Sequence, residues 1–163
     1  MRKILLLLFG IAFLIFTSCE IKVDIEKDTD DIKSVLNQFN KVFETEDIQL
    51  LSEITAHDED MVSFGTDAVE RWVGWESFKE AIQKQFDTLE NTKISAKDQV
   101  LKISQSIDVA WFSYIMDAQA ELQGDQINLE GIRVTGVLEK RDSKWVIVQS
   151  HFSVPVAGQV FEY

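Results

Sequence analysis

The chain of 163 residues is poor in basic side chains, with 16 Lys and Arg against 28 Asp and Glu. It has no cluster of Lys and Arg of the kind that drives binding to phosphate backbones, so nucleic acid is not an expected partner. A nucleophile elbow, a glycine-rich phosphate loop and a spaced set of metal ligands are also missing. We therefore expect no cofactor and no metal, and the sequence leaves open whether the protein is an enzyme at all.

The long apolar run at the N-terminus extends from Ile4 to Phe16 and follows the basic start Met1-Arg2-Lys3. A basic start before a short apolar region is typical of a secretion signal. The run has about 13 residues, and a helix needs ~20 to cross a bilayer, which makes a permanent transmembrane anchor the weaker alternative. We predict that residues 1–18 are a signal peptide.

Cys19 is the only cysteine, and the small polar residues Thr17 and Ser18 precede it directly. This segment resembles the lipobox of bacterial lipoproteins, although Phe16 stands where the commonest pattern has Leu. The resemblance implies that Cys19 becomes the lipid-bearing first residue, which also accounts for a lone cysteine in an exported chain. Its acyl chains would anchor the protein to the inner or outer membrane of a bacterial cell envelope, facing the periplasm.

The rest of the chain reads as one α+β domain at residues 31–163, behind a charged tether at residues 19–30. Apolar residues at helical spacing from Ile32 to Phe43 predict a helix that begins at Asp31, and a shorter helix is expected over residues 48–55. A short strand at residues 61–64 and a third helix from Gly74 to near Asn91 come next. Four strands are expected after them, rich in β-branched and aromatic residues: Gln99–Ser104, Asp108–Leu122, Gln126–Arg141 and Lys144–Val154.

Two stretches carry a family resemblance, one from Asp58 to Gly74 and one from Arg133 to Pro155. They are similar to the SnoaL-like branch of the nuclear transport factor 2-like superfamily, which also contains the association domain of calcium/calmodulin-dependent kinase II. The resemblance implies three N-terminal helices that cover one face of a curved, cone-shaped antiparallel sheet. It says little about activity, because the superfamily places isomerases, dehydratases, assembly domains and binders on one fold.

The resemblance also bears on mechanism. The steroid isomerases of this superfamily place a tyrosine on the first helix, whereas the first helix here has Phe39 and Phe43 at inward positions and no tyrosine. Nothing obvious would therefore donate a hydrogen bond to an enolate oxygen, which counts against isomerase chemistry.

The candidate site residues come from strand alternation and from the resemblance. Arg133 stands among apolar neighbours and matches an arginine that lies deep in the cavity of the kinase association domain; a structural ion pair with Asp67, Glu70 or Asp117 is the alternative. Strict alternation places His151 on a polar face of the last strand, as a pocket residue or as part of a structural polar cluster. Six aromatic residues are candidate pocket walls, with core or interface positions as the alternative: Phe64, Trp72, Trp75, Trp111, Phe112 and Tyr114.

Three functions remain open at this stage. The first is a lipid-anchored domain that binds a small, partly apolar molecule with an anionic or hydrogen-bonding group, through Arg133, His151, Tyr114, Trp72 and Phe64. The second is an isomerase, dehydratase or hydrolase with His151 as general base. The third is an assembly module with a vestigial pocket. In each case the family's habit of pairing through the sheet predicts a homodimer.

Overall fold

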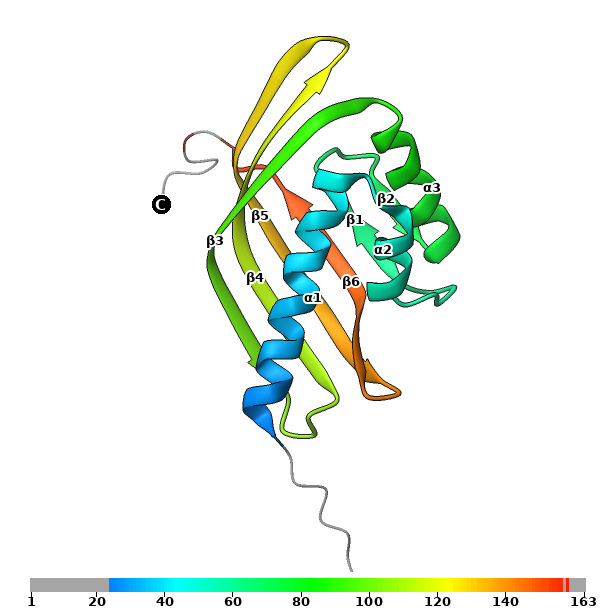
Figure 1. Cartoon of the computed structure of the whole chain (residues 1–163), viewed down its shortest axis with the longest axis vertical. Helices are drawn as coiled ribbons and strands as arrows, with labels where there is room; N and C mark the ends of the chain where they lie inside the picture. The colour runs from blue at the N-terminus through cyan, green and yellow to red at the C-terminus, as the bar shows by residue number, and fades with distance from the viewer. Residues whose placement is uncertain (1–23, 157, 159–163) are drawn as a thin grey trace, which may run out of the picture.

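The computed structural model describes residues 24–156 and 158, so the predicted signal peptide and Cys19 lie outside the described residues. Helices and two short strands come first along this part of the chain, and four longer strands follow (Figure 1). The elements are α1 (Ile25–Thr45), α2 (Ile48–Ile54), β1 (Val62–Phe64), β2 (Arg71–Val73), α3 (Trp75–Phe86), β3 (Leu89–Ile103), β4 (Val109–Leu122), β5 (Asp125–Arg141) and β6 (Lys144–Ser153). No described helix is both long and apolar enough to cross a bilayer.

Helix α1 begins six residues earlier than predicted. The Asp24 side chain accepts a hydrogen bond from the Lys27 backbone N–H and caps the helix, so residues 25–30 of the expected tether are helical. The first turns have a buried anchor in Asp28, which accepts hydrogen bonds from Lys140 and from Trp145. A charged stretch without apolar periodicity has the sequence pattern of a linker. The contacts that Asp28 forms with distant parts of the chain cannot be recognised from that pattern.

The strands form one curved, open sheet in the order β2-β1-β6-β5-β4-β3. The expected sheet was antiparallel throughout, but β1 pairs with β6 in parallel, so the sheet is mixed. The short strand β2 was not predicted, α3 ends at Phe86 rather than near Asn91, and β3 begins at Leu89 rather than Gln99. Strand β3 is polar and largely exposed over its first ten residues, which hides it from a search for hydrophobic alternation.

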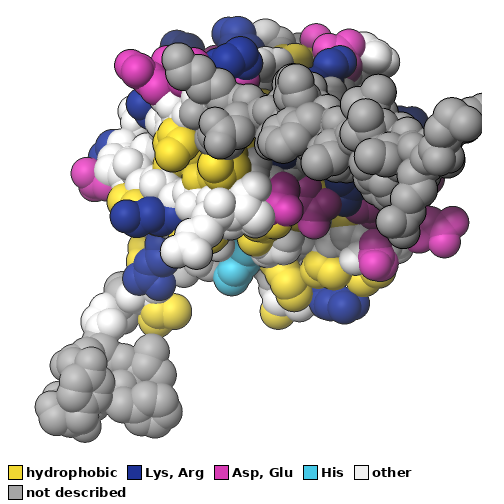
Figure 2. Space-filling model, turned by 90° about the horizontal axis from the view of Figure 1, so that it is seen from below, with side chains coloured by type: hydrophobic (Ala, Val, Ile, Leu, Met, Phe, Trp, Pro, Cys, Tyr) yellow, Lys and Arg dark blue, Asp and Glu magenta, His cyan; other side chains and the backbone are white. Residues whose placement is uncertain are grey.

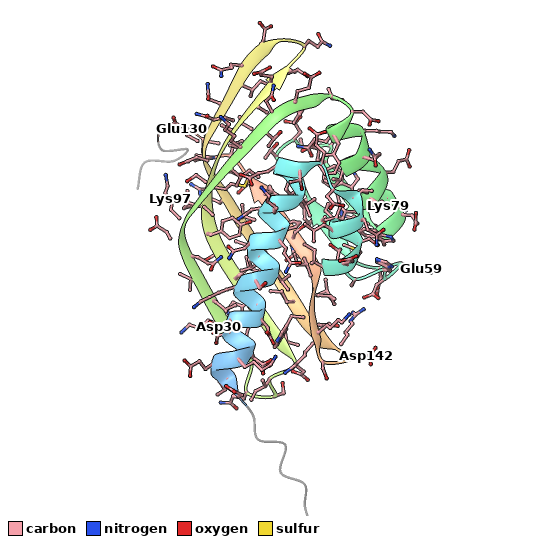
Figure 3. The ribbon with its side chains drawn as sticks, in the orientation of Figure 1. Asp30, Glu59, Lys79, Lys97, Glu130 and Asp142 are labelled. Atoms are coloured by element: carbon pink, nitrogen blue, oxygen red, sulfur yellow. The ribbon has the colours of Figure 1, made fainter. Side chains whose placement is uncertain are left out.

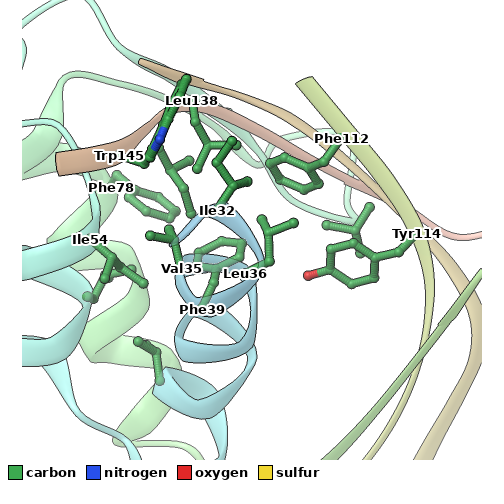
Figure 4. Close-up of a cluster of buried hydrophobic side chains, with 14 of the residues drawn as sticks. Ile32, Val35, Leu36, Phe39, Ile54, Phe78, Phe112, Tyr114, Leu138 and Trp145 are labelled. Carbon is green, nitrogen blue, oxygen red and sulfur yellow. The ribbon is translucent and has the colours of Figure 1, made fainter. Parts of the chain in front are cut away.

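Helix α1 lies across one face of the sheet, and α2 and α3 lie beside it toward the β2 edge (Figure 1). The core forms where these helices meet that face, which we call the inner face (Figure 4). From α1 it takes the predicted helical stripe of Ile32, Val35, Leu36, Phe39 and Val42, all buried. From the sheet it takes Phe112, Tyr114, Ile132, Val134, Leu138, Trp145 and Ile147. Within residues 24–156, no helix covers the opposite face of the sheet, which we call the outer face.

Candidate functional site

A cavity of about 180 Å³ opens at the end of the molecule where α1 ends. It is enclosed by the C-terminal end of α1, by α3, by the β1–β2 connection and by the adjoining parts of β3, β4 and β5. Its walls are mainly apolar, and the aromatic members are Phe43, Trp72, Phe78, Phe86 and Phe152. A concave apolar site with few polar groups is the usual form of a small-molecule binding site.

A bulge in β5 turns more apolar side chains toward this cavity than regular alternation along the strand would. Met116 of β4 pairs with Ile132, but Ala118, two residues later, pairs with Leu129, so β5 carries one extra residue in a β-bulge. Gly131 in the bulge has φ of +71°, a conformation that glycine adopts without strain. The bulge shifts the alternation by one residue, so Ile127, Leu129 and Ile132 all line the cavity.

Glu70 is the polar cavity residue held most firmly. Its carboxylate accepts a hydrogen bond of 2.9 Å from the Asp67 backbone N–H, and its backbone C=O accepts one of 2.9 Å from Gly65 N–H. A Cβ atom at Gly65 would overlap the Glu70 carboxylate and lie 2.8 Å from Cη2 of Trp72. The glycine therefore allows the carboxylate to lie close to the backbone beside the Trp72 ring. The other polar lining residues are Glu46, Thr66, Gln85, Thr92 and Gln119.

Trp72 is the one predicted binding residue that lines the cavity. Tyr114 is on the inner face but is buried in the core, and its hydroxyl donates a 2.8 Å hydrogen bond to Oδ1 of Asn40 (Figure 4). Burial raises the pKa of Tyr114, so the phenol remains neutral and acts as a structural hydrogen-bond donor.

The prediction that Arg133 and His151 face the cavity is wrong, because both are exposed on the outer face. Strand β6 has a bulge at Val148: Val137 pairs with Gln149, while Leu138 pairs with Ile147. The alternation shifts there by one residue, so Ser150 and Phe152 turn inward. His151 turns outward, with its ring 5.5 Å from that of the exposed Phe64.

Two of the acids proposed as partners for Arg133, Glu70 and Asp117, form other contacts. Asp117 pairs with Lys97 at 2.6 Å and also accepts a hydrogen bond from the Gly131 backbone N–H. Both interactions lower the pKa of Asp117, that of Lys97 more strongly. Arg133 needs no such partner, because an exposed guanidinium is solvated by water.

The loop at residues 57–60 lies largely at the surface, and its first residue, His57, stacks on the ring of Trp75 at 4.5 Å. Asp58 accepts two hydrogen bonds of 2.7 and 2.6 Å from the Arg141 guanidinium, which lower the pKa of Asp58. Glu59 points away from the fold, as do Asp30 and Asp142 (Figure 3). Among the residues that the structure describes, no three His, Cys, Asp or Glu side chains converge as a metal site.

Sequence reasoning missed most of the cavity. Glu46 follows α1 in the left-handed conformation, and Glu70 lies in the β1–β2 connection, so neither belongs to a periodic pattern. Ile127 and Leu129 lie before the bulge in β5. Their inward direction depends on the position of that bulge, for which Gly131 is the only local signal.

Comparisons with known proteins agree with this architecture. The family model of the SnoaL-like domain matches residues 32–157. Curated protein sequences gave no significant match. A nuclear transport factor 2-like protein from Salmonella enterica superposes with a TM-score of 0.76 at 15% identity, over 86% of this chain and 99% of that one.

Two further structures extend the comparison. A proposed dehydratase of the NTF2-like family from Streptomyces avermitilis has a TM-score of 0.72 at 14% identity, over 81% of this chain and 99% of that one. A proposed calcium/calmodulin-dependent protein kinase II association domain from Xanthomonas campestris has a TM-score of 0.66 at 19% identity, over 78% and 88%. At these identities the likeness shows the fold alone. With the family match over most of its length, the chain belongs to the SnoaL-like domain family and has the nuclear transport factor 2-like fold.

Proposed function

We propose that this protein is an exported binding protein, anchored to the cell envelope by a lipid on Cys19, that holds a small and mainly apolar molecule in its conical cavity. The observation that carries the binding role is the cavity of about 180 Å³ with five aromatic side chains in its walls. An apolar cavity of roughly 150 Å³ accepts a benzene ring. A ligand with one ring and a short substituent therefore matches the space.

The binding role is tested with 2-phenylethanol, a neutral probe of that size, by ligand-observed NMR on the full-length protein in lipid nanodiscs. Empty nanodiscs serve as the blank. Ala118 lines the cavity, so Ala118→Phe fills it and is expected to weaken binding by more than tenfold while stability is kept or increased. Ala68→Phe, at an exposed turn outside the cavity, is the matched control. Equal binding by both variants would contradict the proposal.

Catalysis by His151 is not favoured by any observation. The imidazole is exposed on the outer face, away from the cavity, and its aromatic neighbour Phe64 offers no proton acceptor or donor. A general base must reach the proton that it abstracts within a bound substrate, and the cavity does not bring a substrate to His151.

A second role, self-association through the outer face, rests on a separate observation. The register aligns Trp111, Val137, Gln149, Val62 and Val73 in one row across five strands of this face. Trp111 is 50% exposed and Val73 is 43% exposed. An exposed row of large apolar side chains is unusual on the surface of a monomeric protein. Seen from below, the end of the molecule has hydrophobic side chains exposed between charged ones (Figure 2).

The row predicts a homodimer in which two outer faces pack together. Sedimentation at micromolar concentration is expected to give a dimer for the parent and a monomer for Trp111→Glu, because the substitution buries a charge in the interface. Val69→Glu, at a 90% exposed position in the β1–β2 connection, is the control and should stay dimeric. A parent protein that sediments only as a monomer would exclude this role.

A further inference from the structure

The charges that line the cavity all have one sign. Glu46 and Glu70 contribute carboxylates, and among the described residues that line it none is Lys, Arg or His. The cation expected to bind an anionic ligand, Arg133, is on the other face of the sheet. An anion that entered this cavity would lose its hydration and meet only like charge, so an anionic ligand is disfavoured.

Glu70 is placed to meet a ligand rather than another part of the protein. Its Oε2 atom accepts one hydrogen bond, from Asp67 N–H, and in the described part of the chain no Lys, Arg or His forms a salt bridge with it. An ionised carboxylate has about four acceptor positions, so most of its capacity is free. The Asp67 contact and the close approach of Gly65 hold the group beside Trp72, at the wall of the cavity.

The aromatic walls favour the same kind of ligand. Trp72, Phe43, Phe78 and Phe86 line the space near which Glu70 lies. The faces of such rings attract cations, most strongly Trp, and the attraction increases when the cation is desolvated. A carboxylate beside aromatic rings therefore offers a cation both an ion pair and cation–π contacts, whereas a neutral molecule gains only apolar burial.

We infer that the ligand of this cavity is a compact aromatic or aliphatic amine, protonated or quaternary, whose apolar body fills the cavity and whose cationic group pairs with Glu70. The inference rests on the proposed function, because it assigns a charge to the molecule that the cavity holds. Glu46, at the end of α1, adds a second negative charge at the same cavity.

Three probes with one aromatic body and different charges test the inference: 2-phenylethylamine as the cation, 2-phenylethanol as the neutral form and 3-phenylpropanoate as the anion. Dissociation constants are measured by ligand-observed NMR on the full-length protein in nanodiscs at pH 7. We expect the amine to bind on the order of tenfold more tightly than the alcohol, and the anion most weakly, because a charge-assisted hydrogen bond adds to equal apolar burial.

The matched variant is Glu70→Gln, which keeps the shape and the Asp67 contact but removes the charge. It should bring the amine and the alcohol within about threefold of each other, because the amine loses its ion pair. Glu53→Gln, the same change on α2 outside the cavity, should keep the parent preference. The order of the three dissociation constants on the parent protein tests the amine assignment without any variant. It therefore remains informative even if Glu70→Gln fails to fold.

The outcomes separate this inference from the proposed function. If the alcohol binds but the amine has no advantage, or the anion binds best, the amine assignment is wrong while the apolar binding site stands. If none of the three binds, the proposed function fails and the inference falls with it. An amine preference that survives in Glu70→Gln also overturns the inference, because the cation would then be recognised elsewhere.

Discussion

Removal of the buried charge of Asp28 is expected to destabilise the fold in a way that depends on pH. Asp28 is 4% exposed, and its Oδ1 atom accepts hydrogen bonds of 2.5 Å from Lys140 Nζ and 2.9 Å from Trp145 Nε1. These contacts join the first turns of α1 to β5 and β6 at the end of the molecule remote from the cavity. The loss of one partner from a buried ion pair costs about 3 to 5 kcal/mol.

The loss of unfolding free energy on substitution of Asp28 should be smaller than for a fully buried pair. The Lys140 side chain is 29% exposed, so its ammonium group can turn toward water. For Asp28→Asn, which still accepts from Trp145, we expect a loss of about 1 to 2 kcal/mol. For Asp28→Ala, which also leaves the buried indole N–H of Trp145 without an acceptor, about 3 kcal/mol is expected. Asp30→Asn, on the same helix at an exposed position, should leave the unfolding midpoint unchanged.

The pH dependence follows from the direction of the pKa shift. Burial raises the pKa of Asp28, but hydrogen bonds from Lys140 and Trp145 together with the Lys140 charge outweigh it, so the folded pKa lies below its ordinary value. A lowered carboxyl pKa stabilises the fold above the unfolded pKa, which is about 3.9, and this contribution is lost as the pH falls through the folded pKa.

Urea denaturation followed by circular dichroism at several pH values measures these effects. The difference between the parent and Asp28→Asn should be constant from about pH 5 to 7 and should shrink below roughly pH 4. If Asp28→Asn and Asp30→Asn unfold at the same urea concentration as the parent at pH 7, the contact contributes nothing and the reasoning is refuted.

Three further predictions concern single positions. Cys19→Ala should abolish incorporation of labelled palmitate, and equal labelling of the variant and the parent would exclude a lipid on Cys19. Arg133→Met should change neither stability nor binding of 2-phenylethanol, because the side chain is exposed on the outer face; a loss of binding in a monomeric sample would contradict the site as described. Gly136→Ala should destabilise the fold by about 1 to 3 kcal/mol, since the new Cβ would lie 2.5 Å from Gln149 O and 2.6 Å from the Phe112 ring; an unchanged urea midpoint would show that the strands separate easily there.

The periodic parts of the fold could be predicted, because each is recorded in a local pattern. The apolar stripe of α1 from Ile32 to Val42 and the strand character of β4, β5 and β6 all follow from side-chain spacing. The start of α1 could not be predicted in this way, because Asp28 is fixed by partners more than a hundred residues away. Strand β2 was missed for a similar reason: its three residues are stabilised by pairing with β1 and have no pattern of their own.

The candidate site was the least predictable part, because it depends on two bulges. Without the bulge at Gly131, alternation along β5 would place Ile127 and Leu129 on the same face as Arg133, outside the cavity. Without the bulge at Val148, His151 would share the inner face with Trp145 and Ile147. The two shifts have a joint effect on the chemistry, since one brings aliphatic side chains into the cavity and the other removes the imidazole. The charge of the cavity is then determined by the glutamates of the connecting segments, which no strand pattern contains. Arg133 and His151 are left to the outer face, which we propose as the contact between two copies of the chain.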